Sequence, residues 1–222
     1  MRIGHASINE NGKTTGGIVG DQNGKEVCIR SWYAKNWTYL LRCKDSKLAE
    51  KMAVACEQGC NNNYIGYDQN RRNTLEAYAI QTKFDLSKIN TPCATDCSAF
   101  MTVCAECAGI PIPYNGYNAP TTRTMKQAFT KTGLFDVLTD KKYLTQIDYL
   151  KRGDILVAEG HHTVMVLDNG KLEDTPKVID IIAKEVINGL YGSGMTRKLK
   201  LEQAGYSYEL VQKRVNEILK GK

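Results

Sequence analysis

The spacing of apolar residues changes part-way along this chain of 222 residues, and the change limits which folds it can adopt. In the first part, apolar side chains recur every three or four positions, as on one face of a helix. After residue 150 they form two continuous runs, at 154–158 and 163–167, as in short buried strands. Helices followed by strands predict an α+β domain with helices packed on an antiparallel sheet. The predicted helices span 45–62, 70–83, 96–108 and 121–132.

Local signals fix some of the predicted ends. Gly109 and Gly133 follow apolar helical patterns and are expected to terminate them, and Thr122 is a candidate cap for the helix at 121–132. Residues 1–30 are rich in glycine and predict short strands and turns. We therefore expect one domain over residues 1–172.

A linker is expected at 173–176, followed by a small helical domain at 177–222. Three short helical patterns, at 178–188, 194–204 and 207–219, predict a three-helix bundle. The residues expected to form its core are Ile181, Ile182, Val186, Leu199, Leu201, Val211, Val215 and Leu219.

The charge balance is positive, and much of it lies in the tail. The formal net charge is +6, and from Lys177 onward nine Lys or Arg residues face five Asp or Glu residues, a difference of +4. A basic module favours a polyanionic partner. Nucleic acid is disfavoured because no recognised binding motif is present, and no apolar run is long enough for membrane insertion. The N-terminal residues contain no secretory signal, so we expect synthesis in a host cytoplasm.

Eight cysteines are many for a chain without an export signal. A disulfide framework is not expected in a chain of this length. Zinc is the alternative, because Cys104 and Cys107 form a CxxC pair and Cys56 and Cys60 lie four positions apart. Both pairs fall in helix-like sequence rather than in tight turns, so reduced, buried thiols are expected, with no metal and no cofactor.

Cys97 stands at the start of a predicted buried helix, where the helix dipole and unpaired N–H groups favour a thiolate and can hold an oxyanion. A thiol also needs a base, most often histidine. The chain has three histidines, and His162 begins a predicted strand. A helix with cysteine followed by a strand with histidine is the order of papain-like folds. Spacing alone leaves open that Cys97 is an ordinary buried cysteine.

Three motifs add a family resemblance to this pattern. The sequence DCSAF at 96–100, RGDIL at 152–156 and GHHTVMVLDNG at 160–170 resemble, in order, motifs of NlpC-like and CHAP-like peptidoglycan amidohydrolases. The resemblance implies a papain-like cysteine hydrolase with Cys97 as nucleophile and His162, rather than His161, as base. The opening, with residues 20–27 and Trp32-Tyr33, also resembles a phage amidohydrolase group.

The resemblance departs from its pattern after Gly170, because no strand follows there to orient the base. The sequence RIGHASI at 2–8 matches the missing strand, so we expect the first strand to lie beside the His162 strand and His5 to orient His162. A surface role for His5, and Asp168 as the orienting group, remain alternatives. Asp96 and Ser98 are expected to position substrate and the oxyanion, and Asp96 is equally expected to cap the helix.

Residues 178–219 resemble the Cpl-seven-type wall-binding repeat, with EVI-x-G-x-Y-G-x-G, then Arg197, AGYSY and VQ-x-x-VN. The resemblance implies binding of the sugar–peptide unit, with Arg197 and Tyr208 as contacts, although Tyr206 and Tyr208 are as well suited to packing. The repeat is usually found in tandem, and the single copy here leaves open an oligomer that restores multivalency.

Together these features predict a phage or prophage endolysin that cleaves an amide bond of the peptidoglycan stem peptide, or its link to muramic acid, by a Cys–His thioester mechanism. It would act on the cell wall after release or holin-type export. The rival prediction is a wall-binding or virion structural protein with a degenerate hydrolase domain.

Overall fold

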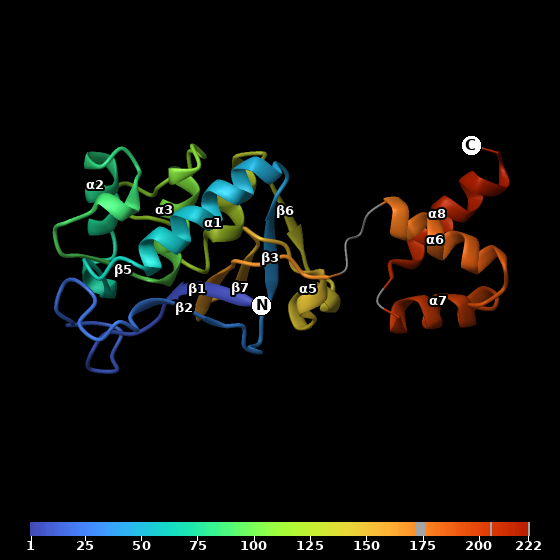
Figure 1. The fold of residues 1–222 in the computed structure, drawn as a ribbon, viewed down its shortest axis with the longest axis horizontal. Helices are drawn as coiled ribbons and strands as arrows, with labels where there is room; N and C mark the ends of the chain where they lie inside the picture. The colour runs from blue at the N-terminus through green and yellow to red at the C-terminus, as the bar shows by residue number, and fades with distance from the viewer. Residues whose placement is uncertain (172–175, 205, 222) are drawn as a thin grey trace. The chain divides into compact units, whose positions relative to one another are not determined.

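The computed structural model describes residues 1–171, 176–204 and 206–221, which fall into two compact units, residues 1–170 and 171–222 (Figure 1). Most of the linker predicted at 173–176 lies outside the described residues, and Pro176 begins a helix. None of the described helices combines the length and apolar character that crossing a membrane requires.

A six-stranded antiparallel sheet forms the centre of the first unit, with the strand order β2-β1-β8-β7-β3-β6. This sheet confirms the predicted α+β class. The two apolar runs form its adjacent middle strands, β7 and β8, while β3 and β6 were not predicted. The strands are β1 (Arg2–Ala6), β2 (Val27–Ser31), β3 (Tyr39–Cys43), β6 (Phe135–Leu138), β7 (Ile155–Ala158) and β8 (His162–Val166).

Helices α1 (Ser46–Cys60) and α3 (Cys97–Cys107) pack against each other on one face of this sheet (Figure 1). Their apolar side chains fill the larger core, which includes Met52, Phe100 and Met165. A smaller apolar cluster around Trp37 covers the opposite face. The remaining elements of the unit are α2 (Thr74–Gln81), α4 (Met125–Lys131), α5 (Lys141–Thr145) and a parallel pair, β4 (Ile65–Tyr67) and β5 (Cys93–Thr95).

One helix start differs from its prediction. Thr122 does not cap α4, because residues 121–124 form a turn in which the N–H of Thr124 and of Met125 both donate to the carbonyl of Thr121. Thr124 takes the cap position instead, and the side chain of Thr122 is buried.

Strand β1 joins the two ends of the first unit, because it pairs with β2 on one side and with β8 on the other. Its Arg2 is held by Asp168, which accepts hydrogen bonds from the Arg2 backbone N–H at 2.6 Å and from Nη2 at 2.7 Å. The N–H of Leu167 donates to the Arg2 carbonyl at 3.0 Å. The first strand therefore lies beside the His162 strand, as predicted.

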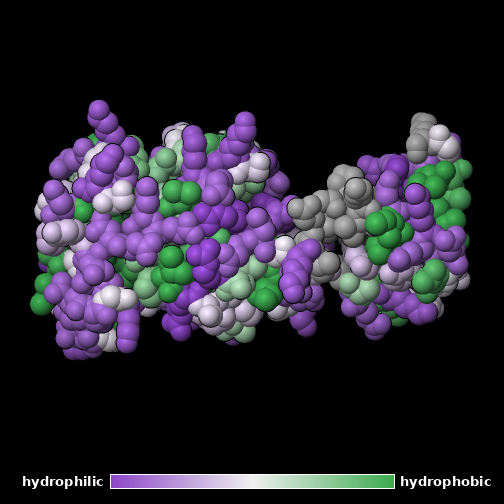
Figure 2. All heavy atoms as spheres, in the orientation of Figure 1, coloured by the Kyte–Doolittle hydropathy of each residue, from purple (hydrophilic) through white to green (hydrophobic). Residues whose placement is uncertain are grey.

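The second unit consists of α6 (Pro176–Ile187), α7 (Gly194–Gln203) and α8 (Tyr208–Leu219). Its core contains Ile182, Ala183, Val186, Leu201, Val211 and Val215. Three residues predicted for this core are instead exposed, namely Ile181, Leu199 and Leu219. Short helices bury one narrow stripe each, so apolar residues beside that stripe stay at the surface, where Figure 2 shows hydrophobic patches.

Helix α1 approaches β1 closely at Gly4. A Cβ atom at this position would lie 2.3 Å from Sγ of Cys56, which is fully buried. We expect Gly4→Ala to lower the free energy of unfolding by about 1–3 kcal/mol through overpacking. Urea denaturation of the variant measures this loss.

The double variant Gly4→Ala/Cys56→Ala provides the control, because it removes the sulfur that the new methyl group would meet. The Gly4 substitution should be much less destabilising in the Cys56→Ala background. An equal loss in both backgrounds would show that the close approach is not the cause.

Candidate active site

Asp96 sets the beginning of helix α3 and thereby places Cys97. Its backbone is extended, and its Oδ1 accepts hydrogen bonds from the N–H groups of Ser98 at 3.0 Å and Ala99 at 2.8 Å. This N-cap leaves Cys97 as the first helical residue, with 6% of its surface exposed. The capping role of Asp96 is thus seen directly. The oxyanion role predicted for Ser98 is not supported, because its N–H is already bonded to Asp96.

His162, the first residue of β8, lies against His5 of β1. Nδ1 of His5 is 3.3 Å from Nε2 of His162, and the two rings meet edge to face with centroids 5.5 Å apart. Asp168, the alternative orienting group, instead holds Arg2 at the other end of β8. The structure therefore places His5, and not Asp168, in contact with His162.

The helix that Cys97 begins packs against the same strand, and the backbone of Thr163 lowers the pKa of the Cys97 thiol. Within the described residues, no hydrogen bond joins Cys97 to His162 directly. Because Nε2 of His162 is in contact with His5, Nδ1 is the ring nitrogen of His162 that remains for another partner.

Aromatic residues from the β2–β3 connection cover the histidine pair. Trp37 stacks on His162, with centroids 6.5 Å apart and an interplanar angle of 27°. The hydroxyl of Tyr33 lies 3.5 Å from Nδ1 of His5, and Sγ of Cys28 lies 3.7 Å from its Nε2. His5 is 1% exposed. Both of its nitrogens therefore have polar neighbours, which fixes the ring that faces His162.

Burial keeps these groups neutral. It raises the pKa of Cys97 to about 12, an effect strengthened by the Asp96 charge and opposed by the hydrogen bond from the Thr163 backbone and by Arg72. Burial, followed by the charges of Lys35 and Arg30, lowers the pKa of His162 to about 4. At neutral pH both the Cys97 thiol and the His162 imidazole are thus uncharged.

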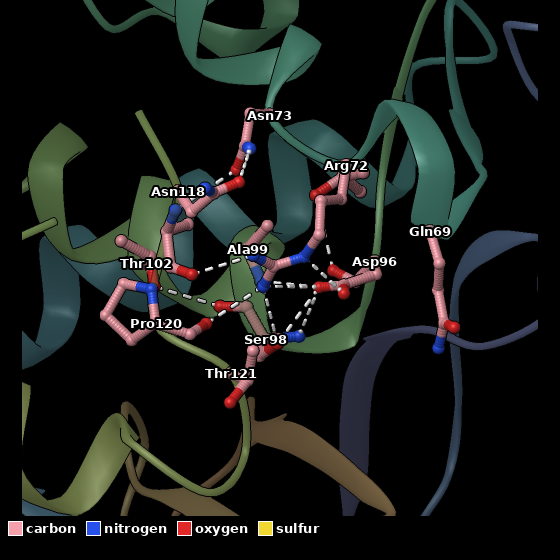
Figure 3. A network of polar contacts seen from close by, with 12 residues as sticks. Gln69, Arg72, Asn73, Asp96, Ser98, Ala99, Thr102, Asn118, Pro120 and Thr121 are labelled. Carbon is pink, nitrogen blue, oxygen red and sulfur yellow. Dashed lines mark hydrogen bonds and ion pairs between the residues drawn. The ribbon is translucent and has the colours of Figure 1, made fainter. Parts of the chain in front are cut away.

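Arg72 is a central residue that the sequence did not indicate (Figure 3). Its guanidinium donates to Asp96 Oδ2 at 2.5 Å, to the Ser98 hydroxyl at 2.9 Å, and to the carbonyl oxygens of Ala119 and Pro120 at 2.7 and 2.9 Å. It neutralises the carboxylate next to the thiol and fixes the loop after residue 118. In the sequence, Arg72 stands in the polar run NRRN, which resembles a solvated helix start.

The loop that Arg72 holds borders a hollow of about 380 Å³, lined by side chains that include Tyr114, Asn118 and Thr121. The described residues contain no group of three or more His, Cys, Asp or Glu side chains that could hold a metal ion. All eight cysteines are free.

The two residues predicted to contact the wall lie within the second unit. Arg197 donates to the Gly192 carbonyl and to Gln212 Oε1, each at 3.0 Å. Tyr208 is half-buried against the core of the three helices, as is Tyr206. Both predicted contacts therefore also hold this unit together.

Comparison with known proteins gives a family match for each of the two units. Residues 3–173 match the endolysin-like domain, and the chain belongs to that family. Residues 180–219 match the CW_7 repeat. A relative named lysozyme, from Streptococcus phage Cp-7, is 30% identical over 139 residues, which cover 56% of this chain and 41% of the relative. The matching segment thus spans less than half of that relative. No solved structure matches the chain.

Replacing Arg72 tests the charge balance around Cys97. Arg72→Met leaves the buried Asp96 carboxylate without its partner, so we expect the free energy of unfolding to fall by about 3–5 kcal/mol. Urea denaturation measures the change. In Arg72→Met/Asp96→Asn no charge is left unpaired, and part of the loss should be recovered. A double variant less stable than Arg72→Met would contradict this account.

The histidine pair also makes stability depend on pH. Burial, with repulsion from His162 and Arg30, lowers the pKa of His5 to about 3. An unfolded histidine takes up a proton near pH 6.5 and the folded His5 does not, so stability falls as the pH drops below 6.5. Between pH 7 and 5, His5 should account for about 2 kcal/mol of the decrease.

The comparison of His5→Gln with wild type, by urea denaturation at pH 7 and pH 5, measures this contribution. The decrease should be smaller in His5→Gln and unchanged in His161→Gln, whose histidine is exposed. An undiminished decrease in His5→Gln would show that His5 is not held neutral.

Proposed function

We propose that the first unit hydrolyses an amide bond of peptidoglycan, either in the stem peptide or at its link to muramic acid, with Cys97 as nucleophile and His162 as base. The observation that carries the proposal is the 3.3 Å contact between His5 and His162, formed by strands from opposite ends of the unit, one of which is β8, the strand against which the Cys97 helix packs. Membership of the endolysin-like domain family supports the same class of substrate.

In the proposed reaction, the sulfur of Cys97 attacks the amide carbon as its proton passes to Nδ1 of His162. The negative charge that develops on the carbonyl oxygen is stabilised by the backbone N–H of Cys97, at the positive end of α3. His162 then gives its proton to the departing amine, and a thioester remains. Water attacks the thioester, returns a proton to the sulfur through His162, and releases the carboxylic acid.

The high pKa of Cys97 and the low pKa of His162 mean that the proton does not transfer before substrate binds. Transfer coupled to attack avoids a separate thiolate in the buried site. His5 keeps the His162 ring oriented with Nδ1 toward the thiol. This division of roles is that of a papain-like hydrolase, and the three motifs at 96–100, 152–156 and 160–170 support an NlpC-like or CHAP-like subtype.

We infer that the second unit holds the enzyme on its substrate. Its match to the CW_7 repeat, its basic charge and its resemblance to wall-binding repeats support attachment to the bacterial wall. A second binding unit on the same chain raises the local concentration of the catalytic unit at the polymer. A single repeat gives modest affinity unless several chains bind together.

Digestion of purified Gram-positive cell walls tests the proposed reaction. Wild type should lower turbidity and release new amino groups, and mass spectrometry of the products identifies the cleaved bond. Cys97→Ala should abolish release, and His162→Ala should reduce it at least about 100-fold, because both proton transfers are lost. Cys107→Ala, at the far end of the same helix, is the matched control and should retain activity.

Co-sedimentation of wild type and the variants with the same walls distinguishes a hydrolase from the rival, a protein that only binds the wall. The proposal is supported if wild type cleaves the walls and the Cys97→Ala variant binds them without cleaving them. Binding without cleavage by wild type, on all walls tried, would instead favour a structural or wall-binding protein. Full activity in Cys97→Ala would exclude the proposed nucleophile.

A further inference from the structure

Two exposed cations, Arg30 and Lys35, lower the pKa of His162 through their charge. Arg30 lies on β2 and Lys35 in the connection that follows it. In the part of the chain that the structure describes, neither residue forms an ion pair with a carboxylate. By contrast, Arg2, Arg42, Arg72 and Arg152 all have carboxylate partners within 3 Å. Arg30 and Lys35 differ in this respect from those four arginines.

The strand register places Arg30 on the same side of the sheet as His5. Arg30 lies opposite Ile3, and Cys28 lies opposite His5. Directly paired residues and every second residue along a strand share a face. This face also carries Trp37 and the ring of His162, so Arg30 projects into the surroundings of the proposed base.

Tyr33 connects Arg30 to the histidines. The Arg30 guanidinium carbon lies 5.1 Å from the centre of the Tyr33 ring, and the hydroxyl of the same ring lies 3.5 Å from Nδ1 of His5. A guanidinium stacked on an aromatic ring is held in place while its edge remains open to accept a planar anion.

These cations oppose the chemistry unless an anion accompanies them. Both Arg30 and Lys35 lower the pKa of His162, which weakens it as a base. A negative group bound by Arg30 would offset this repulsion at the moment when the imidazole must take a proton. Stem peptides carry free carboxylates close to their amide bonds, so the substrate itself can supply that group.

We propose that Arg30, with Tyr33 as a platform, forms a subsite that binds a stem-peptide carboxylate next to the amide to be cleaved. The inference takes its substrate from the proposed function, and it adds that the enzyme prefers a stem peptide with a free carboxylate at this position. A wall whose corresponding carboxylates are amidated should be a poorer substrate.

Two synthetic stem peptides, identical except that one bears a carboxylate where the other bears a carboxamide, test the subsite. Wild type should show a lower KM for the carboxylate peptide. Arg30→Gln should raise that KM about tenfold, as expected for loss of a charge-assisted hydrogen bond, with little change for the carboxamide. Arg30→Lys should restore part of the difference. Lys51→Gln, on the exposed side of α1, is the control.

Binding to Cys97→Ala supplies a readout that does not depend on hydrolysis. Calorimetry should show tighter binding of the carboxylate peptide to Cys97→Ala, and the preference should vanish in Cys97→Ala/Arg30→Gln. Equal binding of the two peptides to Cys97→Ala, or an equal loss for both peptides in Arg30→Gln, would overturn the subsite. Absence of cleavage by wild type with a retained binding preference would overturn the proposed reaction and leave the subsite standing.

Discussion

The position of strand β1 between β2 and β8 is the constraint on which the rest of the first unit depends. The strand brings residues near the start of the chain into contact with residues beyond 160, and the Arg2–Asp168 ion pair closes that junction. Because Gly4 has no side chain, α1 can approach the strand closely, and this fixes the layer of helices that carries Cys97. His5 lies one residue further along the same strand. One strand thus sets both the depth of the helix layer and the orientation of the proposed base.

Around the thiol, opposite charges are arranged so that each offsets another. Asp96 is needed to begin α3, yet its charge opposes a thiolate on the next residue. Arg72 offsets the Asp96 charge, because two of its nitrogens donate to the Asp96 carboxylate. The guanidinium also donates to the Ser98 hydroxyl and to loop carbonyls. On the histidine side no such partner is present among the described residues. The site is therefore balanced on the helix side and positive on the strand side.

The sequence predicted features that depend on local pattern. Helices α1 and α3, the pair of strands around residue 160 and the glycine ends of helices follow from periodicity and from the conformations that glycine allows. The neighbour of β8 was found only because a motif was missing after Gly170 and present at residues 2–8.

Other features depend on contacts that no local pattern encodes. Strands β3 and β6 are short and lack a clear alternation, and their pairing spans about a hundred residues. Arg72 looks like a surface residue until the fold brings it to Asp96. Ile181 and Leu199 were predicted to be buried and are exposed. Helical spacing indicates which residues share an apolar face, but not how much of that face a small core can cover.

The pairing of β1 with β8 also has a consequence for the order of assembly. During synthesis, His5 leaves the ribosome long before His162 exists, so the two imidazoles cannot meet until almost the whole unit is available. The entropy cost of closing a loop of this length must be met before the contacts between β1 and β8 can stabilise the structure. We therefore expect this pairing to form late in folding. If Cys97 and His162 act as proposed, partly made or nicked chains would hold the nucleophile without an oriented base, and hydrolysis would begin only with the finished domain.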